Sequence, residues 1–263
     1  MKRSVYAVLL LMALTPFRAS AQAPFPDLPE LCRDISDVTT PFALVLVNDM
    51  CVDVSESIVR AEKLWTLSIS DLIIGSATIR SLTAVFNPDP FISFGATTVN
   101  AAAVPLTFAF LFGTPIVPDF YTGALSTAGV SVTTGASGSV TVDNSAIYPT
   151  FVSGYGTLGG VPTNLGVDLG TDPCSAGPGA PGADTETCDY GEATNTFAPA
   201  FYDNLEALLT YEQTDGGSVA SWSGSVVLTP QTVPEPFSLF LIGTGLAGVG
   251  VIVRRRRRAT DLE

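Results

Sequence analysis

Six acidic residues crowd one stretch of the chain that is otherwise rich in glycine, proline and threonine. Carboxylates and free backbone carbonyls are the hard oxygen ligands that Ca²⁺ prefers. The spacing matches neither an EF-hand loop nor a glycine-rich calcium nonapeptide, and a flexible acidic loop in solvent is the plainer interpretation. The calcium hypothesis rests on Asp168, Asp172, Asp184, Glu186, Asp189 and Glu192.

Catalytic chemistry has few candidates here. The sequence contains no histidine, which removes Ser-His-Asp and Cys-His arrangements and the common zinc sites. Glycoside hydrolysis needs only two carboxylates across a cleft, so a polysaccharide hydrolase stays open as the alternative to a non-enzymatic protein. Its candidate acids are Asp168, Asp172, Glu186 and Asp189.

Sugar binding is a third hypothesis. Trp65, Trp222 and Tyr155 would form a platform on which sugar rings stack, although tryptophans in alternating strands more often pack in a core.

The four cysteines are even in number, as expected for disulfides in an oxidising compartment, and three pairings are open. Proximity in the sequence favours Cys32 with Cys51 and Cys174 with Cys188. A metal site is disfavoured because there is no C-x-x-C pair.

The C-terminal end carries three features in a fixed order. Val233, Pro234, Glu235 and Pro236 precede an uncharged apolar stretch, residues 237–253. As a helix this stretch is about 26 Å long, close to the hydrocarbon thickness of a membrane. A basic cluster then fixes the cytoplasmic side and leaves 259–263 as a cytoplasmic tail. It consists of Arg254, Arg255, Arg256, Arg257 and Arg258.

This segment, residues 233–258, resembles the PEP-CTERM sorting signal of Gram-negative bacteria. The resemblance implies that an exosortase-type membrane enzyme processes the chain at the Pro-Glu-Pro motif, whose residues are a substrate and not a catalytic site. It also implies passage through the inner membrane to the cell surface or extracellular matrix, in association with exopolysaccharide or biofilm. The alternative is a permanent single-span anchor with a proline spacer.

The N-terminal end reads as a secretory signal. Lys2 and Arg3 precede the apolar run 5–14, and small residues follow at 19–21, so we expect signal peptidase to cleave after Ala21. With basic residues on the inner side at both ends, residues 22–232 form the exported domain.

The exported domain is strongly acidic. The chain has 263 residues and a formal charge of −13, but the basic residues concentrate at its two ends. Between the ends, four basic residues face 22 acidic ones, a formal charge near −18. This balance excludes binding to a nucleic-acid backbone, and an anionic polysaccharide would need a bridging divalent cation.

Alternating apolar residues predict an all-β fold. The clearest strand is 106–112, where Leu106, Phe108, Phe110 and Phe112 share one face with period two. Seven or more strands at intervals of roughly ten residues are typical of an antiparallel β-sandwich. The other expected strands are 42–47, 64–74, 79–86, 91–99, 124–133, 139–142 and 219–228.

Two segments favour short helices, 55–63 and 202–211, the second because Leu205, Leu208 and Leu209 recur at helical spacing. Residues 154–192 are rich in Gly, Pro, Asp and Thr and are expected to form a flexible loop without a core, clipped by Cys174 and Cys188.

Overall fold

The computed structural model describes residues 39–136, 138–145, 148–159, 161–178, 184–214 and 216–231. The expected signal peptide, Ala21, Cys32, the sorting motif, the apolar stretch 237–253 and the arginine cluster lie outside these residues. Within the described ranges, no helix is long and apolar enough to cross a membrane.

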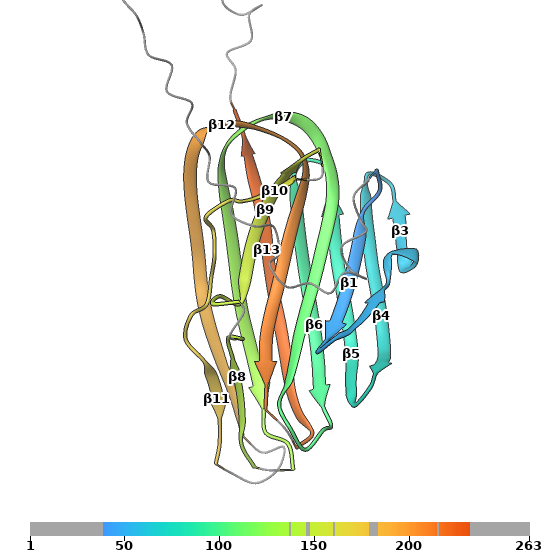
Figure 1. The fold of residues 1–263 in the computed structure, drawn as a ribbon, viewed down its shortest axis with the longest axis vertical. Coiled ribbons are helices and arrows are strands. Elements are labelled where there is room, and N and C mark those ends of the chain that lie inside the picture. Colours follow the sequence, from blue (N-terminus) through green and yellow to red (C-terminus); the bar gives the residue numbers. More distant parts are fainter. Residues whose placement is uncertain are drawn as a thin grey trace, which may run out of the picture.

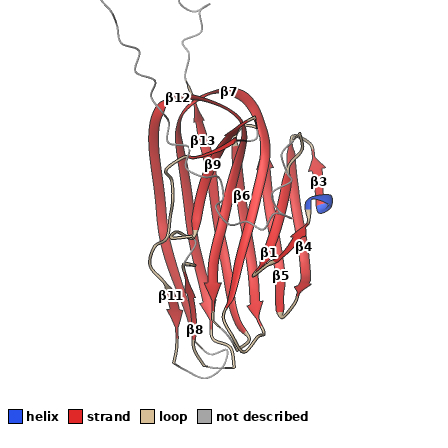
Figure 2. Cartoon of the chain, viewed as in Figure 1, coloured by secondary structure: helices blue, strands red, loops and turns tan. Residues whose placement is uncertain are grey.

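The described chain is almost entirely antiparallel β-structure (Figures 1 and 2), which confirms the all-β prediction. One short 3₁₀ helix, η2, spans Ser55–Ser57. The thirteen strands are β1 (Phe42–Val47), β2 (Met50–Asp53), β3 (Ile58–Ala61), β4 (Leu64–Ile74), β5 (Ala77–Asn87), β6 (Phe91–Asn100), β7 (Leu106–Thr133), β8 (Val140–Asp143), β9 (Val152–Leu158), β10 (Val161–Asn164), β11 (Cys174–Ala176), β12 (Thr185–Gln213) and β13 (Ser218–Pro230).

Strands β7 and β12 are long enough to run through both layers of a sandwich-like sheet (Figure 1). The neighbouring strands with which β7 and β12 pair change along their length. The later half of β7 and the first half of β12 lie beside β13, β6, β5, β4 and β3, which together form layer A. The first half of β7 and the later half of β12 lie beside β1, β2, β9 and β10, which form layer B. Register shifts in β12 near 196–204 mark the bend, as bulges do.

Aromatic side chains fill the space between the layers. Phe108, Phe110 and Phe112 are fully buried, as their alternation predicts. The ring of Phe112 stacks on Phe94 of layer A at 5.2 Å, and Tyr211 of layer B stacks on Trp222 at 5.1 Å. Burial of aromatic side chains on this scale is the main stabilising contribution expected of such a fold.

The outer face of layer B is apolar as well. A second buried cluster lies there, formed by Phe42, Leu44, Leu46, Ala109, Leu111 and Leu208. All six residues of β1 are therefore buried, whichever face they point to.

Three predictions were wrong. The expected helix 202–211 is the later half of β12, and the expected helix 55–63 is η2 followed by β3. The expected loop 154–192 contains β9, β10, β11 and the start of β12, and its Leu165 and Val167 are buried. The expected strands 106–112 and 124–133 are two parts of β7.

Candidate functional site

Hydroxyl side chains form rows across the outward face of layer A. Antiparallel registers align one residue from each of six strands in a single row. In order across β4, β5, β6, β13, β7 and β12, this row is Ser70, Ser81, Thr97, Ser221, Ser131 and Thr187. Neighbouring strands lie about 4.7–4.9 Å apart, so the row repeats a hydroxyl at that interval. We call this surface the hydroxyl face.

Cross-strand hydrogen bonds hold the hydroxyl face in place. Thr97 and Ser221 are joined by their side-chain oxygens at 3.0 Å. Two outward positions further along β7 and β13, the side-chain oxygens of Thr127 and Ser225 are hydrogen-bonded at 2.8 Å. A hydroxyl carries one donor and two acceptor positions, so each such pair keeps bonding capacity for a ligand.

The hydroxyl face is hollowed in its middle. Gly129 stands at an outward position of β7, and Ser223 of β13 lies beside it. Because Gly129 has no side chain, the surface drops to the backbone there. The hollow is shallow and open to solvent, with a volume of about 750 Å³. The residues lining it with outward side chains or as glycine are Ser93, Thr127, Gly129, Ser131, Thr187, Asp189, Gly191, Ser221 and Ser223.

The hollow is nearly uncharged. Of the described residues that line it, Asp189 alone carries a carboxylate, and none carries a positive charge. Asp189 Oδ1 accepts a hydrogen bond from the Gly191 backbone N–H at 2.8 Å. The lining therefore offers hydroxyl and backbone groups, which suit a neutral, hydroxyl-rich ligand.

The structure disperses the residues of the calcium hypothesis. Asp168 lies beyond β10 and accepts two hydrogen bonds from the Asn164 amide, at 3.1 and 3.2 Å. Asp184 lies directly before β12, and Glu186, Asp189 and Glu192 lie along it. Among the residues that the structure describes, no three acidic or cysteine side chains gather closely enough to hold a metal ion. Calcium binding stays a prediction.

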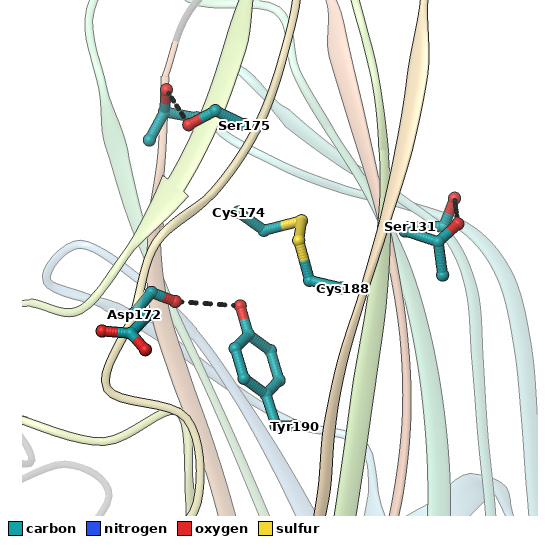
Figure 3. The surroundings of a disulfide bond; sticks show 8 residues. Ser131, Asp172, Cys174, Ser175, Cys188 and Tyr190 are labelled. Carbon is teal, nitrogen blue, oxygen red and sulfur yellow. Dashed lines mark hydrogen bonds between the residues drawn. A yellow bond between two sulfur atoms is a disulfide. The ribbon is translucent and has the colours of Figure 1, made fainter.

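The pairing of Cys174 with Cys188 is confirmed (Figure 3). This disulfide joins β11 to β12, with the two Cα atoms 6.0 Å apart. Beside it, the Tyr190 hydroxyl donates to the backbone oxygen of Asp172 at 3.1 Å, which ties the segment before β11 to the sheet. Cys51 is disulfide-bonded too, and its expected partner Cys32 lies outside the described residues.

The three aromatic residues of the sugar-platform hypothesis do not come together. Trp222 is 2% exposed and packs in the core. Trp65 lies on β4, and the Arg60 guanidinium carbon lies over its ring, 5.6 Å from the centre of the ring. Tyr155 lies on β9 beside the second buried cluster. Stacking on these rings is therefore not how the hydroxyl face would hold a sugar.

One buried acid stands apart from this face. Glu206 on β12 is 6% exposed, and its Oε1 accepts a hydrogen bond from Thr157 at 2.8 Å, whereas its Oε2 has no hydrogen-bond partner. Burial raises the pKa of Glu206 to about 7, against the lowering effect of the Thr157 bond, and Asp203 raises it further. The sequence pattern did not indicate a buried acid at Glu206, because this residue lies within a segment that was expected to be a short helix, 202–211.

The hydroxyl face had a sequence signal that the strand prediction did not use. Ser221, Ser223 and Ser225 alternate with Trp222 and Gly224 along β13, which is the period of an outward polar face. The alignment with β6, β7 and β12 depends on the registers, which one strand alone does not reveal.

Comparisons with known proteins add one firm identification. Residues 232–258 match the family model of the PEP-CTERM protein-sorting motif. No curated relative matches the chain.

Solved structures give only distant likenesses. One is TmCBM61 in complex with beta-1,4-galactotriose, at 6% identity and a TM-score of 0.24, covering 72% of this chain and 88% of that one. Another is a protein of unknown function, SO2946 from Shewanella oneidensis MR-1, at 12% identity and a TM-score of 0.17, covering 78% and 95%. TM-scores this low establish neither a shared fold nor a shared ligand.

Proposed function

Because the chain carries a PEP-CTERM protein-sorting motif, which marks an exported protein that exosortase processes at the membrane, we propose that its β-domain is a non-enzymatic adhesive or structural module. We place it at the cell surface or in the extracellular matrix, where it binds exopolysaccharide through the hydroxyl face. The motif supplies the export route, and the domain supplies the binding surface.

The hydroxyl face is the observation that carries this proposal. The exported domain carries a strong net negative charge, yet the hollow is lined by neutral hydroxyl and backbone groups with Asp189 as its single carboxylate. A polysaccharide presents hydroxyls at regular intervals, and the rows of Ser and Thr offer donors and acceptors at regular intervals across the strands. A flat, repeated contact of this kind favours many weak bonds to a long chain over one tight bond to a small molecule.

The charge of the domain selects among polysaccharides. Asp189 and Glu192 follow one another on the outward side of β12, at the rim of the hydroxyl face. An anionic chain would meet repulsion there, so a neutral chain is the expected ligand and calcium the expected bridge for an anionic one.

One experiment distinguishes binding of the polysaccharide from its cleavage. Protein released from the cell surface is mixed with the producing organism's exopolysaccharide, with calcium and with chelator, and both co-sedimentation and new reducing ends are measured. Binding without reducing ends supports the proposal. Steady release of reducing ends would favour the alternative, a surface-tethered hydrolase with a carboxylate pair.

Gly129→Val tests the hollow directly. A Cβ atom at position 129 would meet only the Cys188 backbone oxygen, at 3.5 Å, an ordinary contact, and valine suits a strand. The fold should therefore persist while the side chain covers the exposed backbone at the floor of the hollow. We expect the affinity for exopolysaccharide to fall roughly tenfold, about 1.4 kcal/mol. Co-sedimentation at several protein concentrations measures it.

Ser68→Val is the matched control. Ser68 is exposed on β4, on the same face but outside the hollow, so it receives the same side chain without filling the site. An equal loss of affinity in both variants would contradict the role of the hollow.

A further inference from the structure

Strands β7 and β12 bend between the layers at one end of the sandwich (Figure 1). Large apolar side chains of these strands are exposed at the bend. Phe120 is 49% exposed, and its register partner Phe201 is 37% exposed. Their rings meet edge to face at 5.5 Å. In each strand the next residue, Tyr121 or Tyr202, is buried, so alternation places the phenylalanines outward on a packed support.

Three further apolar residues belong to the same end. Val117, three residues before Phe120, is 61% exposed. Leu158 and Val161 flank the turn between β9 and β10, and the Gly159 backbone N–H in that turn donates to Asp203 on β12 at 3.1 Å. We call this set the apolar tip: Val117, Phe120, Leu158, Val161 and Phe201. Soluble domains seldom gather large apolar side chains in one place without a partner.

The last described residues before the sorting motif lie beside the apolar tip. Pro230, the last residue of β13, pairs with Tyr121, and the Gln231 backbone N–H donates to the Phe120 backbone oxygen at 2.8 Å. The motif follows at residue 232. Five residues separate Gln231 from the start of the apolar stretch at Phe237, so the distance between these two residues is at most roughly 20 Å when the chain is fully extended.

We propose that the apolar tip rests in the lipid interface of the membrane while the chain awaits processing. The short tether leaves the tip no room to lie far from the bilayer once residues 237–253 enter it. Phenylalanine and aliphatic side chains gain from the boundary between headgroups and acyl chains, while Asp119 and Asp203 beside them stay among the headgroups. The docked tip would hold the Pro-Glu-Pro segment at the membrane surface, within reach of a membrane enzyme.

The test uses the full chain in vesicles of phosphatidylethanolamine with a minor share of phosphatidylglycerol. Phe201→Cys carries a nitroxide spin label, and Val59→Cys, on the edge strand β3 and 60% exposed, carries the same label as control. Collision rates with oxygen, which concentrates in lipid, and with a water-soluble nickel chelate are compared. We expect the ratio of oxygen to nickel collisions to be severalfold higher at position 201 than at position 59.

Equal ratios at the two positions would overturn the proposal. So would a label at 201 that is open to nickel in pure-lipid vesicles but shielded in native inner membranes, since that assigns the tip to a protein partner. A thermal unfolding curve of each labelled protein, unchanged from that of the unmodified chain, shows that the readout comes from a folded domain. Phe120→Ser combined with Phe201→Cys should lower the ratio at 201 toward that of the control.

Discussion

Alanine in place of Pro234, Glu235 and Pro236 is expected to leave the protein in the inner membrane with its arginine tail attached. These residues precede the apolar stretch within the matched motif, where exosortase processes the chain. A change of all three removes the recognised segment but leaves the apolar stretch 237–253 and the arginines, which still stop transfer. Surface release should therefore fall to background.

Mass spectrometry of the surface and membrane fractions measures this result. Thr229→Ala, an exposed change near the end of β13 and outside the motif, should leave release unaltered. The permanent-anchor alternative makes the opposite prediction for the unaltered protein. A surface product whose peptides run intact from Phe237 into Arg254 would contradict processing.

Glu206→Gln is expected to remove a pH dependence of stability of roughly 3 kcal/mol. The pKa of Glu206 is about 7 in the folded domain against a usual 4.5. In the folded domain Glu206 therefore stays protonated over a pH range in which the same side chain of the unfolded chain is already ionised. Stability is highest at low pH within this range, falls as the pH rises from about 4.5 to about 7, and levels off above; each unit of pKa difference is worth about 1.4 kcal/mol.

Denaturant unfolding at several pH values measures the effect. Glutamine keeps the shape and the contact with Thr157 but carries no charge, so the variant should be more stable than the parent at about pH 8 and close to it at about pH 5. Glu192→Gln, an exposed change on the same strand, is the control and should keep the parent's slope. An unchanged slope in Glu206→Gln would show that another group titrates on unfolding.

Period-two alternation carried the correct part of the sequence prediction. Phe108, Phe110 and Phe112 recur at every second position, so the period was visible although Ala109 and Leu111 on the opposite face are buried as well, and these phenylalanines belong to the main core. Strand β1 shows no alternation and could be predicted for a different reason, because its six consecutive apolar residues form a short run between Pro41 and Asn48.

The later half of β12 could not be read in this way. Leu205 and Leu209 point into the main core, while Leu208 packs on the other side in the second cluster. A strand buried on both faces loses its alternation, and three leucines at these positions then fit a helix as well. Pairing with β7 and β9, which lie far away in the sequence, settles the conformation.

The hydroxyl face shows the same limit for the site. Each strand displays its own alternation of Ser or Thr, but a hollow around Gly129 exists only because β13, β7 and β12 align in one register. The prediction of a flexible loop at 154–192 was wrong for a related reason. Its glycines and prolines are typical of loops, yet Leu165, Val167 and Leu169 bury their side chains against the sheet.

Carboxyl footprinting of the protein bound to exopolysaccharide tests the central claim most directly. A water-soluble carbodiimide with an amine tag modifies exposed acids, and peptide mass spectrometry reads each position with and without the polysaccharide. We predict protection of Asp189 and Glu192, beside the hollow, and none of Glu56 on η2 or Asp119 at the apolar tip. Protection of Glu56 or Asp119 with Asp189 still open to modification would place the bound chain elsewhere and contradict the hydroxyl face as the binding surface.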